Sequence, residues 1–273
     1  MAQRCARIGD LLLGGDRLFL IAGPCVIESE ALCRRIAEHL RKVTERLDIP
    51  YIFKASYDKA NRTSTRSYRG PGWEEGLRIL DRVRGAFGVP VLSDVHTVEQ
   101  AEIAGKVLDC LQVPAFLCRQ TDLVQAAGRC GKAVNLKKGQ FLAPWDMKNV
   151  VDKAAEAGAK NILVTERGTS FGYNRLVADM TALPDLAALG HPVVFDATHS
   201  AQQPGGLGNA TGGSREMAAL LARAAVAAGA DGQFQEVHPE PDKAFSDGPN
   251  SLALADVERV LETCLAIRSA VRT

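Results

Sequence analysis

The 273-residue sequence lacks an excess of charge of either sign. Its 33 lysines and arginines nearly balance 32 aspartates and glutamates, and the formal net charge is +1. A protein that binds nucleic acid or an anionic membrane by general electrostatic attraction needs a marked positive excess. We therefore expect no nucleic-acid partner, and any basic residues that bind an anion must be gathered locally.

Long apolar segments are also missing. No run approaches the roughly 18–20 residues that a membrane-spanning helix needs. The first ten residues have no apolar core of the signal-peptide kind, and the apolar stretch that starts at Leu11 is broken by Gly14, Gly15 and Asp16. We expect no membrane association and a cytoplasmic location.

The seven cysteines contain no CxxC pair, and their number is odd. This pattern argues against a disulfide framework and is typical of a reducing compartment. A free cysteine is most often a small buried hydrophobic residue, and we interpret six of the seven in this way. Cys25 differs because it ends a predicted strand.

Eight short, nearly continuous apolar segments recur along the chain, as in strands buried on both faces. They lie at residues 19–25, 51–56, 89–95, 110–115, 133–138, 161–167, 192–198 and 232–237. Helical patterns such as Leu32, Ile36 and Leu40 separate most of them. Eight strand–helix units predict an α/β protein with a single (β/α)₈ TIM-barrel domain over residues 1–273, the barrel lying at about 19–271.

An open, doubly wound sheet is the alternative architecture. It would require a glycine-rich phosphate turn after the first strand, where the sequence reads AGPC rather than GxGxxG. Before that strand, two apolar segments at 8–13 and 17–20 flank Gly14, Gly15 and Asp16. They predict a β-hairpin at about residues 8–20 that plugs the bottom of the barrel.

Polar residues follow the carboxyl end of every predicted strand, the end where TIM barrels carry their active sites. One such lysine, histidine or aspartate alone is usually a solvated charge or a turn residue, but their occurrence at all eight strands is not expected by chance. Five cations would converge on one mouth: Lys54, Lys59, Arg62, Lys137 and Arg167. Because unpaired cations repel one another, we expect a ligand with phosphate and carboxylate groups.

A second set of residues has the ligand types of a divalent metal site. Cys25, His199 and Glu236 end the first, seventh and eighth predicted strands, and Asp247 lies just beyond the eighth. Thiolate, imidazole and carboxylate together suit a borderline divalent ion. These residues are far apart in sequence, so the prediction depends on closure of the barrel, which makes the three strands neighbours.

Nine segments, in order along the chain, carry a family resemblance. They read IAGPCVIES, FKASYDKANRTS, PVLSDVH, LQVPAFLCRQTDL, NLKKGQFLAPWD, TERGTSFGYN, FDATHS, QEVHPEP and SDGPNSLAL, over about residues 19–254. By these motifs the sequence resembles the 3-deoxy-D-manno-octulosonate 8-phosphate synthases. The resemblance implies a transferase that condenses phosphoenolpyruvate, D-arabinose 5-phosphate and water and releases inorganic phosphate. It further implies a role in making a lipopolysaccharide precursor and a homotetramer.

The same resemblance assigns residues, motif by motif. The phosphoenolpyruvate site would comprise Lys54, Ser56, Lys59, Gln112, Lys137 and Arg167. Arabinose 5-phosphate would contact Asn61, Arg62 and Thr63, with Asp94 and Arg119 nearby; the family often has Ser in place of Thr63, and the hydroxyl is kept. The catalytic roles would fall to Lys59, Lys137, His199 and Asp247.

Cys25 decides which branch of the family the chain resembles. Metal-dependent members have Cys at the end of the first strand, and metal-independent members have Asn. The resemblance therefore implies one divalent ion, with Cys25, His199, Glu236 and Asp247 as ligands, and manganese, iron(II), zinc and cobalt all suit it. It leaves open whether the metal or Lys59 polarises the sugar aldehyde and in which order the bonds form.

Two other functions are compatible with parts of the pattern. One is the sister activity that makes 3-deoxy-D-arabino-heptulosonate 7-phosphate from erythrose 4-phosphate, whose sugar motif reads KPRTS where this chain has KANRTS. The other is a non-catalytic barrel that binds a sugar phosphate. Such a protein should have lost part of the cation or ligand set, and here every position is filled.

Overall fold

A computed structural model of the protein describes residues 4–206 and 211–272. Within them, eight parallel strands form the barrel: β3 (Phe19–Gly23), β4 (Tyr51–Lys54), β5 (Val91–Asp94), β6 (Cys110–Val113), β7 (Ala133–Lys137), β8 (Ile162–Glu166), β11 (Val193–Asp196) and β14 (Gly232–His238). They pair in chain order, and β14 pairs with both β11 and β3, which closes the sheet. The predicted TIM barrel is confirmed, and the open sheet is excluded.

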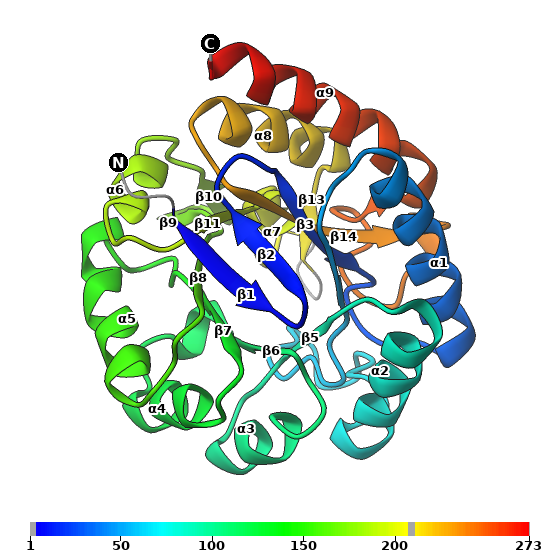
Figure 1. The fold of residues 1–273 in the computed structure, drawn as a ribbon. Coiled ribbons are helices and arrows are strands. Elements are labelled where there is room, and N and C mark those ends of the chain that lie inside the picture. Colours follow the sequence, from blue (N-terminus) through cyan, green and yellow to red (C-terminus); the bar gives the residue numbers. More distant parts are fainter. Residues whose placement is uncertain (1–3, 207–210, 273) are drawn as a thin grey trace.

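Helices surround the barrel (Figure 1). The main ones are α1 (Glu30–Arg46), α2 (Trp73–Phe87), α3 (Val98–Ala104), α4 (Thr121–Arg129), α5 (Met147–Glu156), α6 (Ala182–Ala187), α8 (Arg215–Ala227) and α9 (Val257–Val271). Short elements occupy several loops: α7 (Ala197–Ser200), β9 (Thr169–Gly172), β10 (Arg175–Val177), β12 (Gln202–Gln203), β13 (Gly212–Gly213), β15 (Leu252–Ala253) and four 3₁₀ turns, the first being η1 (Ala115–Leu117). None of the described helices is long and apolar enough to cross a membrane.

The barrel strands bury both faces, as their apolar sequences predict. In β3, Leu20 and Ala22 belong to the outer core between strands and helices, whereas Phe19 and Ile21 belong to an inner core to which all eight barrel strands contribute. This alternation follows from the two-residue period of a strand. The inner core fills the amino-terminal end of the barrel. Polar residues therefore occupy the carboxyl ends of the strands.

The N-terminal hairpin consists of β1 (Cys5–Ile8) and β2 (Leu11–Gly14) and lies across the amino-terminal end of the barrel (Figure 1). Ile8 and Leu13 are fully buried in the inner core, so the hairpin plugs the barrel as expected.

The predicted bounds of the hairpin were wrong. The chain turns at Gly9 and Asp10, where Gly9 has a φ of +55° that suits a two-residue hairpin turn. Gly14 has a φ of +88° and lies where the chain leaves the hairpin, and a Cβ there would come within 2.2 Å of the Arg4 carbonyl oxygen. Residues 19 and 20, assigned to the second arm, belong to barrel strand β3.

Candidate active site

A pocket of about 520 Å³ opens where the barrel strands end. Its lining contains all five predicted cations, namely Lys54, Lys59, Arg62, Lys137 and Arg167. Asn61, Thr63, Asp94, Gln112, His199 and Asp247 line it as well. The structure therefore gathers on one cavity most of the residues that the sequence singled out.

Three predicted site residues lie behind the lining, and one lies away from it. Cys25, Ser56 and Glu236 are buried beneath the pocket surface. Arg119 follows the turn η1, is exposed, and does not line the pocket. That turn brings Phe116 into the lining instead. The contact of Arg119 with a sugar substrate stays a prediction.

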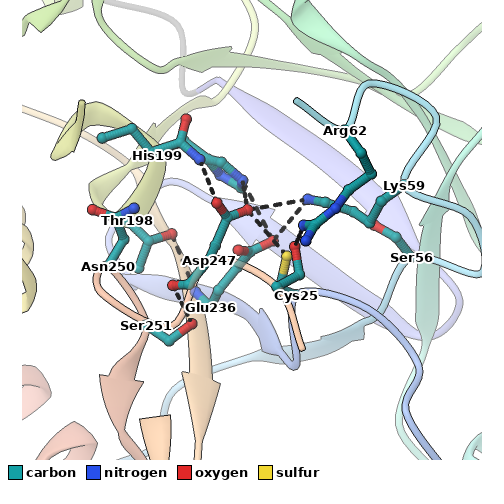
Figure 2. Close-up of polar contacts among 12 residues, drawn as sticks. Cys25, Ser56, Lys59, Arg62, Thr198, His199, Glu236, Asp247, Asn250 and Ser251 are labelled. Atoms are coloured by element: carbon teal, nitrogen blue, oxygen red, sulfur yellow. Dashed lines mark hydrogen bonds and ion pairs between the residues drawn. The ribbon is translucent and has the colours of Figure 1, made fainter. Parts of the chain in front are cut away.

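Cys25, Glu236 and Asp247 form a compact group of potential metal ligands (Figure 2). Their nearest ligand atoms lie within 4.8 Å of one another, and Cys25 Sγ donates to Asp247 Oδ2 at 3.2 Å. His199 Nε2 lies 3.5 Å from Glu236 Oε1 and 4.0 Å from Asp247 Oδ2. In the described part of the chain, Glu236 Oε2 is buried without a hydrogen-bond partner. Donor types and an unsatisfied carboxylate oxygen together fit a divalent ion.

Barrel closure produces this group, because β14 lies between β3 and β11. Cys25 follows β3, Glu236 lies within β14, and His199 is carried by α7 rather than by the end of the predicted strand 192–198. Asp247, in the loop after β14, has a φ of +51°. Its carbonyl accepts hydrogen bonds from the backbone of Asn250 and Ser251, each at 3.0 Å, which holds the loop turned toward the barrel.

Two lysines place positive charge beside the carboxylates. Lys54 Nζ lies 2.8 Å from Glu236 Oε1, and Lys59 Nζ lies 3.8 Å from the same atom and 3.5 Å from Asp247 Oδ2 (Figure 2 shows the Lys59 contacts). Burial by itself would lower the pKa of Lys54, but Glu236 and Asp94 outweigh it and raise that pKa. Burial, and then Glu236, raise the pKa of the Cys25 thiol. A bound cation is what would hold this sulfur as a thiolate.

Asp196 is a buried acid to which sequence reasoning gave no role. Its carboxylate forms an ion pair with Lys137 Nζ and lies 2.7 Å from His199 Nδ1. Burial would raise the pKa of Asp196, but His199 and Lys137 outweigh it and hold that pKa well below the ordinary value. The available indication was an Asp three residues before His199, at the N-cap of α7.

The two arginines differ from the lysines because no carboxylate of the described residues lies within ion-pairing distance of either. Arg167 Nη2 donates to the His199 carbonyl at 2.9 Å and to Gln202 Oε1 at 3.0 Å, while its Nε is buried and unsatisfied. Arg62 donates to the Phe245 carbonyl and to Ser246 Oγ, and its Nε is likewise unsatisfied. A planar guanidinium with an unsatisfied N–H group can bind the oxygens of a phosphate or carboxylate ligand.

A chain of side-chain hydrogen bonds runs across five neighbouring strands, from Ser56 after β4 to Thr165 in β8. Ser56 donates to Asp94 Oδ2 at 2.5 Å, and Gln112 donates to Asp94 Oδ1 at 2.6 Å. Gln112 in turn accepts from Asn135 at 2.8 Å, and Asn135 accepts from Thr165 at 2.6 Å. Asn135 and Thr165 were missed because they lie within β7 and β8, before the polar strand ends from which the candidates were taken. The chain fixes Gln112 and Asp94 in the floor of the pocket.

Comparison with known proteins places the chain in a family. The family model described as "DAHP synthetase I family" matches residues 5–273. A 2-dehydro-3-deoxyphosphooctonate aldolase of Geotalea uraniireducens is 60% identical over 266 residues, which are 97% of this chain and 98% of that protein. Proteins of the same name from Trichlorobacter lovleyi and from Cyanothece sp. are 59% and 58% identical; the first match covers 97% of this chain and 98% of the relative, and the second covers 96% of each.

These matches are nearly full-length, and the relatives' common name is another name for the enzyme family that the motifs resemble. The chain therefore belongs to the DAHP synthetase I family and, within it, to the 2-dehydro-3-deoxyphosphooctonate aldolases.

Proposed function

We propose that the chain condenses phosphoenolpyruvate with D-arabinose 5-phosphate and water to give 3-deoxy-D-manno-octulosonate 8-phosphate and inorganic phosphate. The observation that carries this proposal is one pocket lined by Arg62 and Arg167, neither of which has a carboxylate within ion-pairing distance among the described residues. The thiol–carboxylate group adjoins this pocket through Asp247, which belongs to its lining. Two phosphorylated substrates need cations at both ends of a cavity. A carbon–carbon bond between them also needs a positive group in the middle that polarises the sugar aldehyde. The product of this reaction would be the lipopolysaccharide precursor that the sequence resemblance implies.

Phosphoenolpyruvate would bind through Lys54, Ser56, Lys59, Gln112, Lys137 and Arg167. The buried position of Lys54, Lys137 and Arg167 supports this assignment, because buried cations interact more strongly with an anion than exposed ones do. Asn61, Arg62 and Thr63 would hold the phosphate of the sugar. Asp94 and Arg119 would lie nearby, although Arg119 does not belong to the pocket lining.

The ligand group would hold one divalent ion through Cys25, His199, Glu236 and Asp247. When bound, the ion would supply positive charge that stabilises the oxygen of the sugar aldehyde as carbon 3 of the enol attacks. Lys59, beside Glu236 and Asp247, is placed to donate a hydrogen bond to the same oxygen. Asp247 would orient the water that attacks carbon 2 and act as its base, and His199 would accept the proton only when its Nε2 does not hold the ion. Phosphate then leaves by cleavage of its bond to carbon 2.

The finer properties of the protein are part of the same proposal. We infer one catalytic domain over residues 1–273, in the cytoplasm, which the seven free cysteines support. We also infer a homotetramer. Large aromatic side chains that are exposed in the single chain, including Phe141, Trp145, Phe171 and Tyr173, are of the type that subunit contacts bury. Light scattering in solution tests the subunit number.

Phosphate release with each of two aldehydes tests the function. We expect rapid release from phosphoenolpyruvate with arabinose 5-phosphate, slow release with erythrose 4-phosphate, and loss of both in chelator. Faster reaction with erythrose 4-phosphate would instead identify the seven-carbon activity. No release with either sugar, from folded protein supplied with manganese, would leave the non-catalytic binding barrel.

A further inference from the structure

The carboxylate of Asp196 has four polar contacts beside the pocket, although Asp196 does not belong to the pocket lining. Its Oδ2 accepts from Lys137 Nζ and lies 2.7 Å from His199 Nδ1. Its Oδ1 accepts from His199 N at 2.9 Å and from Thr198 Oγ1 at 3.2 Å. A carboxylate has about four acceptor positions, so these four partners use its capacity. Asp196 therefore acts through its neighbours rather than on a substrate.

The partners of Asp196 belong to two different parts of the site. Lys137 is one of the cations, and its Nζ also lies 3.7 Å from the centre of the Phe234 ring, so the ammonium is held from two sides. His199 belongs to the ligand group. Thr198 Oγ1, which donates to Asp196, also accepts from Glu236 N at 3.3 Å (Figure 2 shows this second bond). One buried carboxylate thus touches both the cation set and the ligand set.

The contact with His199 fixes where the imidazole proton lies. An ionised carboxylate only accepts hydrogen bonds, so the neutral ring must carry its proton on Nδ1 to bond Asp196. The lone pair of Nε2 is then free and faces Glu236 Oε1 and Asp247 Oδ2, at 3.5 and 4.0 Å. This tautomer is the one that can bind a metal through Nε2.

We propose that Asp196 is a positioning residue that sets the tautomer of His199 and the place of the Lys137 ammonium together. The proposal rests on the proposed function for what these two groups do, but the tautomer itself can be measured without metal or substrate. It follows that both the affinity for the metal ion and catalysis depend on Asp196, although this residue contacts neither the ion nor the substrate.

The substitution Asp196→Asn tests this role. The amide keeps the shape but replaces one acceptor with an NH₂ donor, which must face two of the former donors. The backbone N–H of His199 cannot change, whereas the imidazole can move its proton. We therefore expect the ring to switch to the Nε2–H tautomer and the affinity for Mn²⁺ to fall about 10- to 100-fold.

Two measurements read these effects. The ¹⁵N shifts of the His199 ring, assigned by their absence in His199→Gln and recorded on metal-free protein at a pH where the ring is neutral, report the tautomer. Competition with a chelator reports Mn²⁺ affinity. Asp231→Asn is the matched control, because Asp231 is a buried acid that precedes β14, pairs with Arg4, and lies outside the pocket lining. It should leave both readouts as in the wild type.

An unchanged His199 tautomer in folded Asp196→Asn would overturn the proposal. If the wild type binds Mn²⁺, a changed tautomer with unchanged Mn²⁺ affinity would overturn it too. An Nε2–H tautomer in the wild type would contradict it even if the variant fails to fold. A wild type that binds no Mn²⁺ but changes tautomer on substitution would refute the metal part of the proposed function and uphold the positioning role of Asp196.

Discussion

At the scale of single residues, the side chain at position 25 distinguishes a site that uses a metal ion from one that uses hydrogen bonds alone. Its sulfur lies with the carboxylates of Glu236 and Asp247, so its proposed work is to hold a cation that positions the aldehyde. An amide at the same place could supply positioning through hydrogen bonds alone. We expect wild-type activity to vanish in chelator and to return with manganese, Cys25→Asn to keep part of its activity in chelator, and Cys25→Ala to be nearly inactive there.

The comparison of the three proteins, each with chelator and with added manganese, is the measurement. Metal content determined on the same samples serves as the control. Full wild-type turnover by protein shown to be metal-free would refute metal dependence.

Lys137 carries both a binding and a structural role. The sequence offers it no nearby acid, which predicts a role toward substrate with little effect on stability. The structure instead pairs it with buried Asp196. We expect Lys137→Ala to lower kcat/KM roughly 100-fold or more, as for loss of a charged stabilising group. It should also destabilise the fold by about 3–5 kcal/mol, because a buried carboxylate loses its partner.

Enzyme kinetics and urea unfolding measure the two effects of Lys137→Ala. Lys148→Ala, which removes an exposed lysine paired with Asp152, is the control and should cost no more than about 1 kcal/mol. A Lys137→Ala protein as stable as the wild type would show that the pair with Asp196 contributes nothing to the fold.

At the scale of elements, the hairpin should contribute stability without contributing chemistry. Leu13 of β2 is fully buried in the inner core, whereas its neighbour Leu12 is 55% exposed. Leu13→Ala should cost about 2–5 kcal/mol through lost burial and the cavity left behind, and Leu12→Ala about 0.5 kcal/mol or less. Denaturant unfolding measures both. Equal effects of the two substitutions would refute the plug, and kcat of the folded fraction should not change in either.

The loop between β4 and α2 meets the loop after β14 through Arg62, whose guanidinium bonds Phe245 O and Ser246 Oγ. If this guanidinium holds the sugar phosphate, Arg62→Ala should raise KM for arabinose 5-phosphate about 10- to 100-fold and leave KM for phosphoenolpyruvate nearly unchanged. Exposed Arg66, in the same loop and outside the pocket lining, is the control. An unchanged KM for the sugar in Arg62→Ala would remove Arg62 from the site.

At the scale of the whole molecule, Asp94 links the charge of the pocket to acid stability. Burial by itself would raise the pKa of Asp94, but Lys54 and Lys137 outweigh it and hold that pKa below its ordinary 3.8. The folded protein then binds fewer protons here than the unfolded chain does. The stabilisation is present above pH 3.8 and is lost as the pH falls from there toward the lower pKa of the folded state.

Urea unfolding of wild type and Asp94→Asn across pH 6 to pH 2.5 tests this linkage. The difference in unfolding free energy should shrink below pH 3.8, at a rate of up to about 1.4 kcal/mol per pH unit. A difference that stays constant over the whole range would show that Asp94 carries an ordinary pKa.

The sequence alone was sufficient for the fold class, and most of the side chains that it singled out line one pocket. The strands are apolar on both faces, and polar residues follow each of them at the same end. That periodicity depends on burial and on strand geometry, both of which are local properties of the chain. The motifs around Cys25, Lys59 and Asp247 then indicated the family, which the full-length relatives confirm.

The tertiary structure decided which charges meet. Asp196 and Lys137 are 59 positions apart, and Lys54 and Glu236 are 182 apart. No local pattern predicts such pairs, because barrel closure and side-chain reach determine them. The hairpin turn at Gly9 likewise depended on which apolar residues could enter the barrel. The sequence determined which side chains lie at the mouth. Packing determined that Lys54, Lys59 and Lys137 pair with carboxylates, whereas no carboxylate of the described residues lies within ion-pairing distance of Arg62 or Arg167.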